Sequence, residues 1–69
     1  MNANATNQSL PVRLIRLPEV MHRVGLCRTS IYMRIAAGRF PAPKKIGRAA
    51  VWSENDIINW IKNVLASDQ

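Results

Sequence analysis

The apolar and polar residues of this chain are spaced for helices in three places and for short strands between them. The first helix is predicted to begin at Leu17 and Pro18, because proline is tolerated in the first turn, where its missing N–H would have no partner. Gly25 ends this helix, which is only about two turns long. Its apolar positions at helical spacing are Val20, Met21 and Val24.

A second helix is predicted over residues 28–37. Ile31 and Ile35 are four residues apart, so they lie on one face of this helix. Cys27 and Thr29 are both near its N-cap, and threonine is the better cap because its hydroxyl can accept a hydrogen bond from a free backbone N–H. The two helices and their glycine-containing turn are typical of a helix-turn-helix. Its predicted inner face consists of Val20, Met21, Val24, Leu26, Ile31 and Ile35.

The remaining segments predict a short strand and a hairpin. Residues 12–16 are rich in branched side chains and suit a brief strand. The prolines of residues 40–43 exclude regular helix there, because they remove hydrogen-bond donors and restrict their neighbours. A hairpin is predicted over residues 44–52, with its turn at residues 47–49. Gly47 supplies the backbone angles that a tight turn requires.

The third helix has the clearest start in the chain. Ser53 places a capping hydroxyl three residues before Asp56, which is close to the capping-box pattern. The following apolar residues have a period near 3.6 and give one broad apolar face. They are Ile57, Ile58, Trp60, Ile61, Val64 and Leu65.

These elements define one small domain that is mainly α-helical with a small β-hairpin. A chain of 69 residues has room for a single domain, which we assign to residues 11–66. Residues 1–10 form a polar N-terminal tail, expected to be disordered because it has little to bury, and residues 67–69 form a C-terminal tail. Such a short chain has a thin core and is expected to act through its outer surface. The aromatic residues are assigned to the core, where they bury a large area; they are Tyr32, Phe40, Trp52 and Trp60.

Charge adds to this picture because it is unevenly distributed. Ten Lys and Arg residues stand against four Asp and Glu, which gives a formal net charge of +6. Glu19, Glu54 and Asp56 lie near predicted helix starts, where the helix dipole favours negative charge. No acidic residue lies between the two glutamates, and a segment of one sign creates a positive face suited to phosphate binding. The basic residues of this segment are Arg23, Arg28, Arg34, Arg39, Lys44, Lys45 and Arg48.

The second helix carries the first set of candidate DNA contacts. The N-terminal part of a recognition helix contacts base edges in the major groove. Arginine can pair with both acceptors of guanine, hydroxyl groups can contact bases or phosphates, and an apolar side chain can contact a thymine methyl. The alternatives are an ordinary antiparallel helix pair and, for the methionine, a plain surface position. The candidate residues are Arg28, Thr29, Ser30, Met33 and Arg34.

The hairpin carries a second set of basic residues at or beside its turn. Long basic side chains at such a position suit phosphate contacts or insertion into a neighbouring minor groove. The alternative is a solvated run of charge. The hairpin residues are Lys44, Lys45 and Arg48, and Arg23 and Arg39 are further candidate phosphate contacts at the edges of the helix pair.

Other chemistry is expected to be absent. His22 and Cys27 are too few for a structural zinc site, and no catalytic constellation is suggested, so we expect neither an enzyme nor a cofactor. The first residues lack the pattern of a signal peptide, and no apolar stretch approaches the ~20 residues of a membrane span. A single cysteine cannot form an internal disulfide, which fits the cytoplasm. We expect a cytoplasmic monomer that can assemble cooperatively on DNA.

Several short motifs occur in order along the chain. They are residues 14–20 (LIRLPEV), 24–32 (VGLCRTSIY) and 38–43 (GRFPAP), followed by Ile46-Gly47-Arg48, Val51-Trp52 and Ile58-Asn59-Trp60-Ile61. Together they resemble the AlpA family of prophage regulators. The resemblance covers residues 13–62, which is nearly all of the predicted domain. One residue departs from the family, which usually has serine where this chain has Cys27.

The resemblance implies a winged-helix fold related to excisionase and MerR-type DNA-binding domains, with residues 28–37 as recognition helix and 44–52 as wing. It implies a sequence-specific double-stranded DNA-binding regulator of a prophage or integrated element, which activates transcription of integrase or excision genes. An architectural excisionase that bends att-site DNA and recruits integrase is the first alternative. A basic module that binds an acidic protein is the second. Integrase and RNA polymerase are the protein partners that these hypotheses name.

Overall fold

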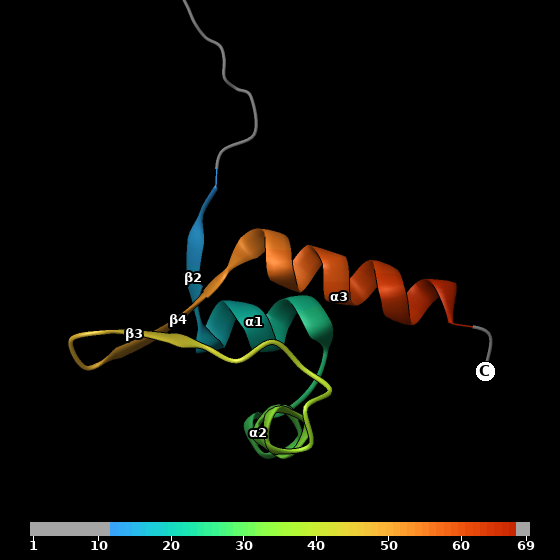
Figure 1. Ribbon diagram of the computed structural model, residues 1–69, viewed down its shortest axis with the longest axis horizontal. Helices are drawn as coiled ribbons and strands as arrows, with labels where there is room; N and C mark the ends of the chain where they lie inside the picture. The colour runs from blue at the N-terminus through green and yellow to red at the C-terminus, as the bar shows by residue number, and fades with distance from the viewer. Residues whose placement is uncertain (1–11, 68–69) are drawn as a thin grey trace, which may run out of the picture.

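Three helices and a three-stranded antiparallel sheet make up the computed structural model, which describes residues 12–67. The predicted N-terminal tail at residues 1–10, and residues 68–69 of the predicted C-terminal tail, lie outside the described residues. Figure 1 shows the sheet with its hairpin on one side of the view, and α3 extending to the other. The elements are β2 (Leu14–Arg16), α1 (Leu17–Val24), α2 (Arg28–Ala36), β3 (Lys44–Ile46), β4 (Ala49–Ser53) and α3 (Glu54–Ala66).

The central strand of the sheet is β4, in the order β2-β4-β3. Ile15 of β2 pairs with Trp52, and Lys45 of β3 pairs with Ala50. The hairpin is confirmed, but its turn consists of two residues rather than the predicted three, since Ala49 already pairs with Ile46. The predicted strand at residues 12–16 is also shorter than expected, and it joins the hairpin to form one sheet.

The predicted ends of α1 and the predicted start of α3 are confirmed. Gly25 closes α1 in the left-handed conformation, with φ of 72°, and its N–H donates to the carbonyl oxygen of Met21 at 2.9 Å. Glycine adopts this conformation without the steric penalty of a Cβ atom. At α3, the N–H of Asp56 donates to the Oγ of Ser53 at 3.4 Å. Local signals in the sequence therefore set both ends of α1 and the start of α3.

Of the two residues predicted near the N-cap of α2, the preferred one, Thr29, is wrong. Cys27 occupies the N-cap position, without a side-chain hydrogen bond, and Thr29 lies inside the first turn of the helix. The helix also ends one residue earlier than predicted, at Ala36. Because α2 lacks the capping hydrogen bond that usually stabilises a helix start, it depends on packing against the rest of the domain.

The core is built by one or two buried side chains from almost every element. α1 contacts both other helices and the strands β2 and β4. The predicted inner face of the helix pair is confirmed: Val20 and Ile31 are fully buried, and Met21, Val24, Leu26 and Ile35 pack half-buried against them. The buried residues of the described part are Ile15, Val20, Ile31, Phe40, Val51, Trp52 and Ile57.

The aromatic residues divide between core and surface. Phe40 and Trp52 are buried and Trp60 is half-buried, as predicted, but Tyr32 is 37% exposed. Tyr32 lies at the border of the buried face of α2 and touches Trp52 edge-on, with 6.5 Å between the ring centroids. The assignment of Tyr32 to the core was therefore wrong: this ring covers Trp52 at the surface of the domain.

Both indole N–H groups bind the segment between α2 and β3. The Nε1 of Trp52 donates to the carbonyl oxygen of Pro41, and the Nε1 of Trp60 donates to that of Arg39, each at 2.9 Å. Phe40 lies between these two carbonyls in the chain and packs edge-on against Trp60, at 4.9 Å between centroids. The connection from α2 to the hairpin is therefore attached to both β4 and α3.

The two faces of α2 should respond differently to truncation. Ile31→Ala leaves a cavity in the core, and we expect the free energy of unfolding to fall by roughly 2–5 kcal/mol. Met33 is 67% exposed on the other side of the helix, so Met33→Ala should cost less than about 0.5 kcal/mol. Urea denaturation followed by circular dichroism measures both values. Similar losses for the two variants would contradict this packing of α2.

Candidate nucleic-acid interface

The outer face of α2 carries most of the predicted helix contacts. Arg28, Thr29, Met33 and Arg34 are exposed, whereas Ser30 is half-buried. Ile31 anchors the opposite face in the core. The packing of α2 against the domain therefore leaves these side chains on its outer surface.

The two arginines of α2 are each held by a residue one turn away. The guanidinium of Arg28 lies over the ring of Tyr32, 5.9 Å from its centroid, which is a cation–π contact. Arg34 donates from Nη1 to the Oγ of Ser30 and, at 3.3 Å, to the carbonyl oxygen of Ser30. Among the described residues neither guanidinium is paired with a carboxylate. The positive charge of this face is therefore not neutralised by an ion pair within residues 12–67.

The hairpin presents its basic side chains to solvent. All of β3 is exposed, including Lys44 and Lys45, and Arg48 is exposed in the turn. Figure 1 shows the β3–β4 hairpin projecting away from the helices. Ile46 at the end of β3 is also 57% exposed, a feature that the sequence analysis did not single out. The hairpin thus combines three exposed cations with one exposed apolar side chain.

A hollow links α2 to the sheet. It has a volume of about 430 Å³, and Arg28 and Tyr32 of α2 line it together with Arg16 of β2 and Ala50 of β4. Arg16 is an exposed cation that sequence reasoning missed, because it precedes Glu19 and so falls outside the acid-free segment. Arg16 extends the positively charged surface of α2 towards the hairpin, and we call the exposed cations of α2, Arg16 and the hairpin the basic surface.

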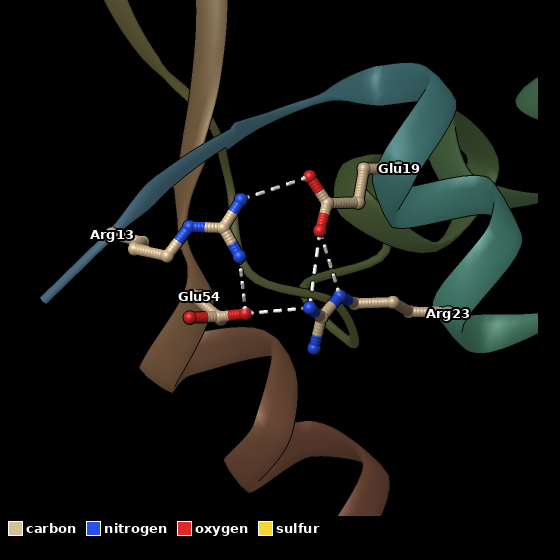
Figure 2. A network of polar contacts seen from close by, with 4 residues as sticks. All are labelled: Arg13, Glu19, Arg23 and Glu54. Carbon is tan, nitrogen blue, oxygen red and sulfur yellow. Dashed lines mark hydrogen bonds and ion pairs between the residues drawn. The ribbon is translucent and has the colours of Figure 1, made fainter. Parts of the chain in front are cut away.

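Arg23 belongs to a different cluster of charges, shown in Figure 2. Its guanidinium contacts Glu19 at 3.0 Å and Glu54 at 2.6 Å, and Arg13 contacts Glu54 at 3.0 Å and Glu19 at 3.4 Å. Two guanidinium groups thus meet two carboxylates that come from α1 and α3. Because its charge is balanced within this network, Arg23 is a weaker candidate for a phosphate contact than the cations of α2 and the hairpin.

Arg39 follows α2 in the chain and lies on the side of the domain where α2 approaches α3. It is exposed and lines a shallow hollow together with Arg34 of α2 and with Trp60 and Asn63 of α3. This hollow extends from α2 towards the C-terminal half of α3. Arg39 thus lies just beyond the end of α2, and its role as a phosphate contact stays a prediction.

Residues 12–67 hold neither a candidate metal site nor a candidate membrane-spanning helix. No three His, Cys, Asp or Glu side chains of these residues gather in a way that could hold a metal ion. None of the helices in this part of the chain has the length and apolar character needed to cross a membrane. Cys27 is exposed and is not in a disulfide.

The chain matches one family model over most of its length. The model is that of prophage CP4-57 regulatory protein (AlpA), and it matches residues 13–65. This chain belongs to the AlpA family. A relative of this AlpA chain in Enterobacteria phage P4, named "Uncharacterized protein ORF88", is 36% identical over 55 residues, which are 78% of this chain and 62% of that protein. No solved structure matches the chain significantly.

Membership of the AlpA family confirms the resemblance read from the motifs. The AlpA match begins at Arg13, which belongs to the ion-pair network, and ends at Leu65 in the last turn of α3. It therefore includes the basic surface of α2, the hairpin and the acidic partners of the network. The family is described as regulatory.

The ion-pair network of this AlpA domain should contribute to its stability. Arg23→Met keeps most of the apolar stem but leaves Glu54, whose side chain is only 14% exposed, with Arg13 alone. We expect the free energy of unfolding to fall by about 1 kcal/mol, and by less in about 1 M salt because salt screens partly exposed pairs.

Lys62→Met is the matched control, since Lys62 is an exposed cation of α3 and takes no part in the ion pairs of the described residues. Thermal or urea unfolding at two salt concentrations measures the difference. An equal loss in both variants would show that the network adds no stability.

Proposed function

We propose that this chain is a winged helix-turn-helix regulator that binds double-stranded DNA of a prophage or other integrated element in a sequence-specific way. In this proposal α2 enters the major groove and the β3–β4 hairpin is the wing. The observation that supports it most is the outer face of α2, where Arg28 and Arg34 have no carboxylate partner among the described residues. Its membership of a prophage regulatory family supports the same proposal.

The outer face of α2 has the chemistry for reading base edges. Arg28 and Thr29 lie in the first turn of the helix, which is the part of a recognition helix that contacts bases. Arg34 bonds to Ser30 in the free protein and would exchange these bonds for the two acceptors of a guanine. Because each arginine is already oriented along the helix, binding orders fewer free side chains.

The hairpin suits contacts that carry no sequence information. Lys44 and Lys45 lie on an exposed edge strand, and Arg48 lies in the turn. Lysine and arginine at such positions contact phosphates, fix the register of a protein on the duplex, or enter the minor groove. Arg16 and Arg28, which line one hollow, connect this surface to α2.

By analogy with its family, the regulator would activate transcription of integrase or excision genes, with RNA polymerase as protein partner. It would act in the cytoplasm, where the DNA is, and as a monomer in solution. The alternative in which the basic surface binds an acidic protein is separated from DNA binding by the effects of Arg34→Ala and Lys45→Ala.

Arg34 and Lys45 should affect DNA binding in different ways. Arg34→Ala should relax the preference for one base pair, at a cost of roughly 1–3 kcal/mol on the preferred sequence, whereas Lys45→Ala should weaken all sequences about equally. Lys45→Ala should also remove about one phosphate contact, so the slope of log binding constant against log salt concentration should become less steep by about 0.9.

Lys62→Ala on α3 provides the charge-matched control. Fluorescence anisotropy with the preferred duplex and an unrelated duplex, each over a range of salt, measures these effects. If Arg34→Ala and Lys45→Ala left DNA binding unchanged but abolished binding to a protein, the interaction-module alternative would replace the proposal.

A second candidate function, an architectural excisionase, is favoured by Ile46. This side chain is 57% exposed beside Lys45 at the end of the projecting strand β3. Apolar side chains that enter the minor groove partly unstack base steps and bend the duplex. An excisionase of this kind would bend att-site DNA and recruit integrase.

Replacing Ile46 tests this second function. If the hairpin acts as a wedge, the wild-type protein should bend its target by roughly 20–90°, and Ile46→Ala should bend it less. Leu14→Ala removes an exposed apolar side chain from β2, the other edge of the sheet, and should leave the bend unchanged. Circularly permuted DNA fragments report the bend angle. A straight complex with the wild-type protein would exclude the wedge.

A further inference from the structure

The residues on the outer face of α2 fall into three rows along the helix. With ~3.6 residues per turn, Met33 lies about 180° from the midpoint of Ile31 and Ile35, which face the core. Thr29 and Ala36 lie on the same side of the helix as Met33, four residues before it and three residues after it. The row that points directly away from the domain is therefore mainly apolar.

The cations lie in the rows on either side of this apolar row. On one side Arg28 is held over Tyr32, and on the other Arg34 is bonded to Ser30. Each guanidinium is therefore drawn along its own row by a partner one turn away. This arrangement leaves the centre of the face free of charged groups.

The apolar row also lines a shallow hollow. It has a volume of about 520 Å³, and it is bordered by the contact between Arg28 and Tyr32. Met33 is 67% exposed here, and a methionine side chain is flexible and polarizable enough to adapt to a small apolar group. A group that contacts the centre of this face would therefore meet an apolar surface, with the arginines within reach of its polar neighbours. The residues that line it are Arg28, Thr29, Tyr32, Met33 and Ala36.

The major groove offers a group of this kind at thymine. Its C5-methyl is the apolar feature that base edges present there, next to the hydrogen-bonding groups of the same and neighbouring bases. We propose that Met33 contacts thymine C5-methyl groups and selects DNA that has thymine beneath the middle of α2. This inference rests on the proposed function, and it adds to it the chemical feature that the centre of the helix reads. Arg28 and Arg34 would contact the bases or phosphates on either side.

The test removes the methyl group from the DNA and leaves the hydrogen-bonding groups in place. Selection from a random duplex library first provides a preferred sequence for the wild-type chain. Each thymine of that duplex is then replaced in turn by deoxyuridine, and fluorescence anisotropy gives the dissociation constants. Binding by the wild-type protein should weaken roughly 3- to 5-fold at one or more neighbouring positions, as expected for one buried methyl group.

For Met33→Ala, the ratio of the dissociation constant for the deoxyuridine duplex to that for the thymine duplex should be about 1 at those positions. Leu65→Ala is the matched control, because it removes an exposed apolar side chain from α3 and should keep the wild-type ratio. Circular dichroism confirms that both variants are folded.

Three outcomes would overturn the inference. Equal affinity of the wild-type protein for the thymine and deoxyuridine duplexes at every position would show that no methyl group is read, while DNA binding itself stands. A full wild-type ratio in Met33→Ala would assign the methyl contact to another residue. If no sequence is enriched and no salt-dependent binding to duplex DNA is found, the proposed function fails together with the inference.

Discussion

The relative position of α2 and the hairpin depends on two hydrogen bonds from tryptophan side chains. The segment that joins them contains Pro41 and Pro43, which have no N–H, so it cannot form a regular ladder of its own. The carbonyl oxygens of Arg39 and Pro41 instead accept from the indoles of Trp60 and Trp52. In so small a domain, where the core is thin, the same two residues supply apolar area and hydrogen-bond donors. Trp52 and Trp60 therefore hold the segment between α2 and the hairpin in place, and no further residues are needed for this.

The charges of the domain are separated into a balanced cluster and an unbalanced surface. The network of Arg13, Arg23, Glu19 and Glu54 has no net charge and ties α1 and α3 to the chain before β2. The backbone supports this contact, since the N–H of Glu54 donates to the carbonyl oxygen of Arg13 at 2.8 Å. With two of the four acidic residues used there, the formal excess of +6 falls on the rest of the chain. The helix dipole alone, which explained both glutamates from sequence, gave no reason to expect this separation.

Local signals in the sequence predicted much of the fold. Gly25 and the pair Ser53 and Asp56 act within one helical turn, so the ends of α1 and the start of α3 could be read directly. The pairing of β2 with β4 could not, because Ile15 and Trp52 are far apart in sequence and a three-residue strand has no pattern that specifies its partner.

The candidate site could be predicted in composition but not in arrangement. The spacing of Ile31 and Ile35 identified the buried side of α2, and so its outer residues as well. The outward position of Tyr32 was missed, because an aromatic side chain at the border of an apolar face can cover the core from outside. The balanced state of Arg23 depends on Glu54, which is distant in sequence and is brought close by folding.

Both basic elements carry an exposed apolar side chain as well as cations. On α2, Met33 lies between the rows of Arg28 and Arg34, and on the hairpin Ile46 stands between Lys45 and Arg48 in the sequence. Exposure alone carries no weight, since single apolar residues are common on protein surfaces. The cations on the same element give the exposure a meaning. Their attraction to phosphates holds a DNA duplex against the element, whatever the base sequence of the DNA. In the proposed complex each apolar side chain would then be pressed against the bases, where a methyl group or a deformable step decides the energy.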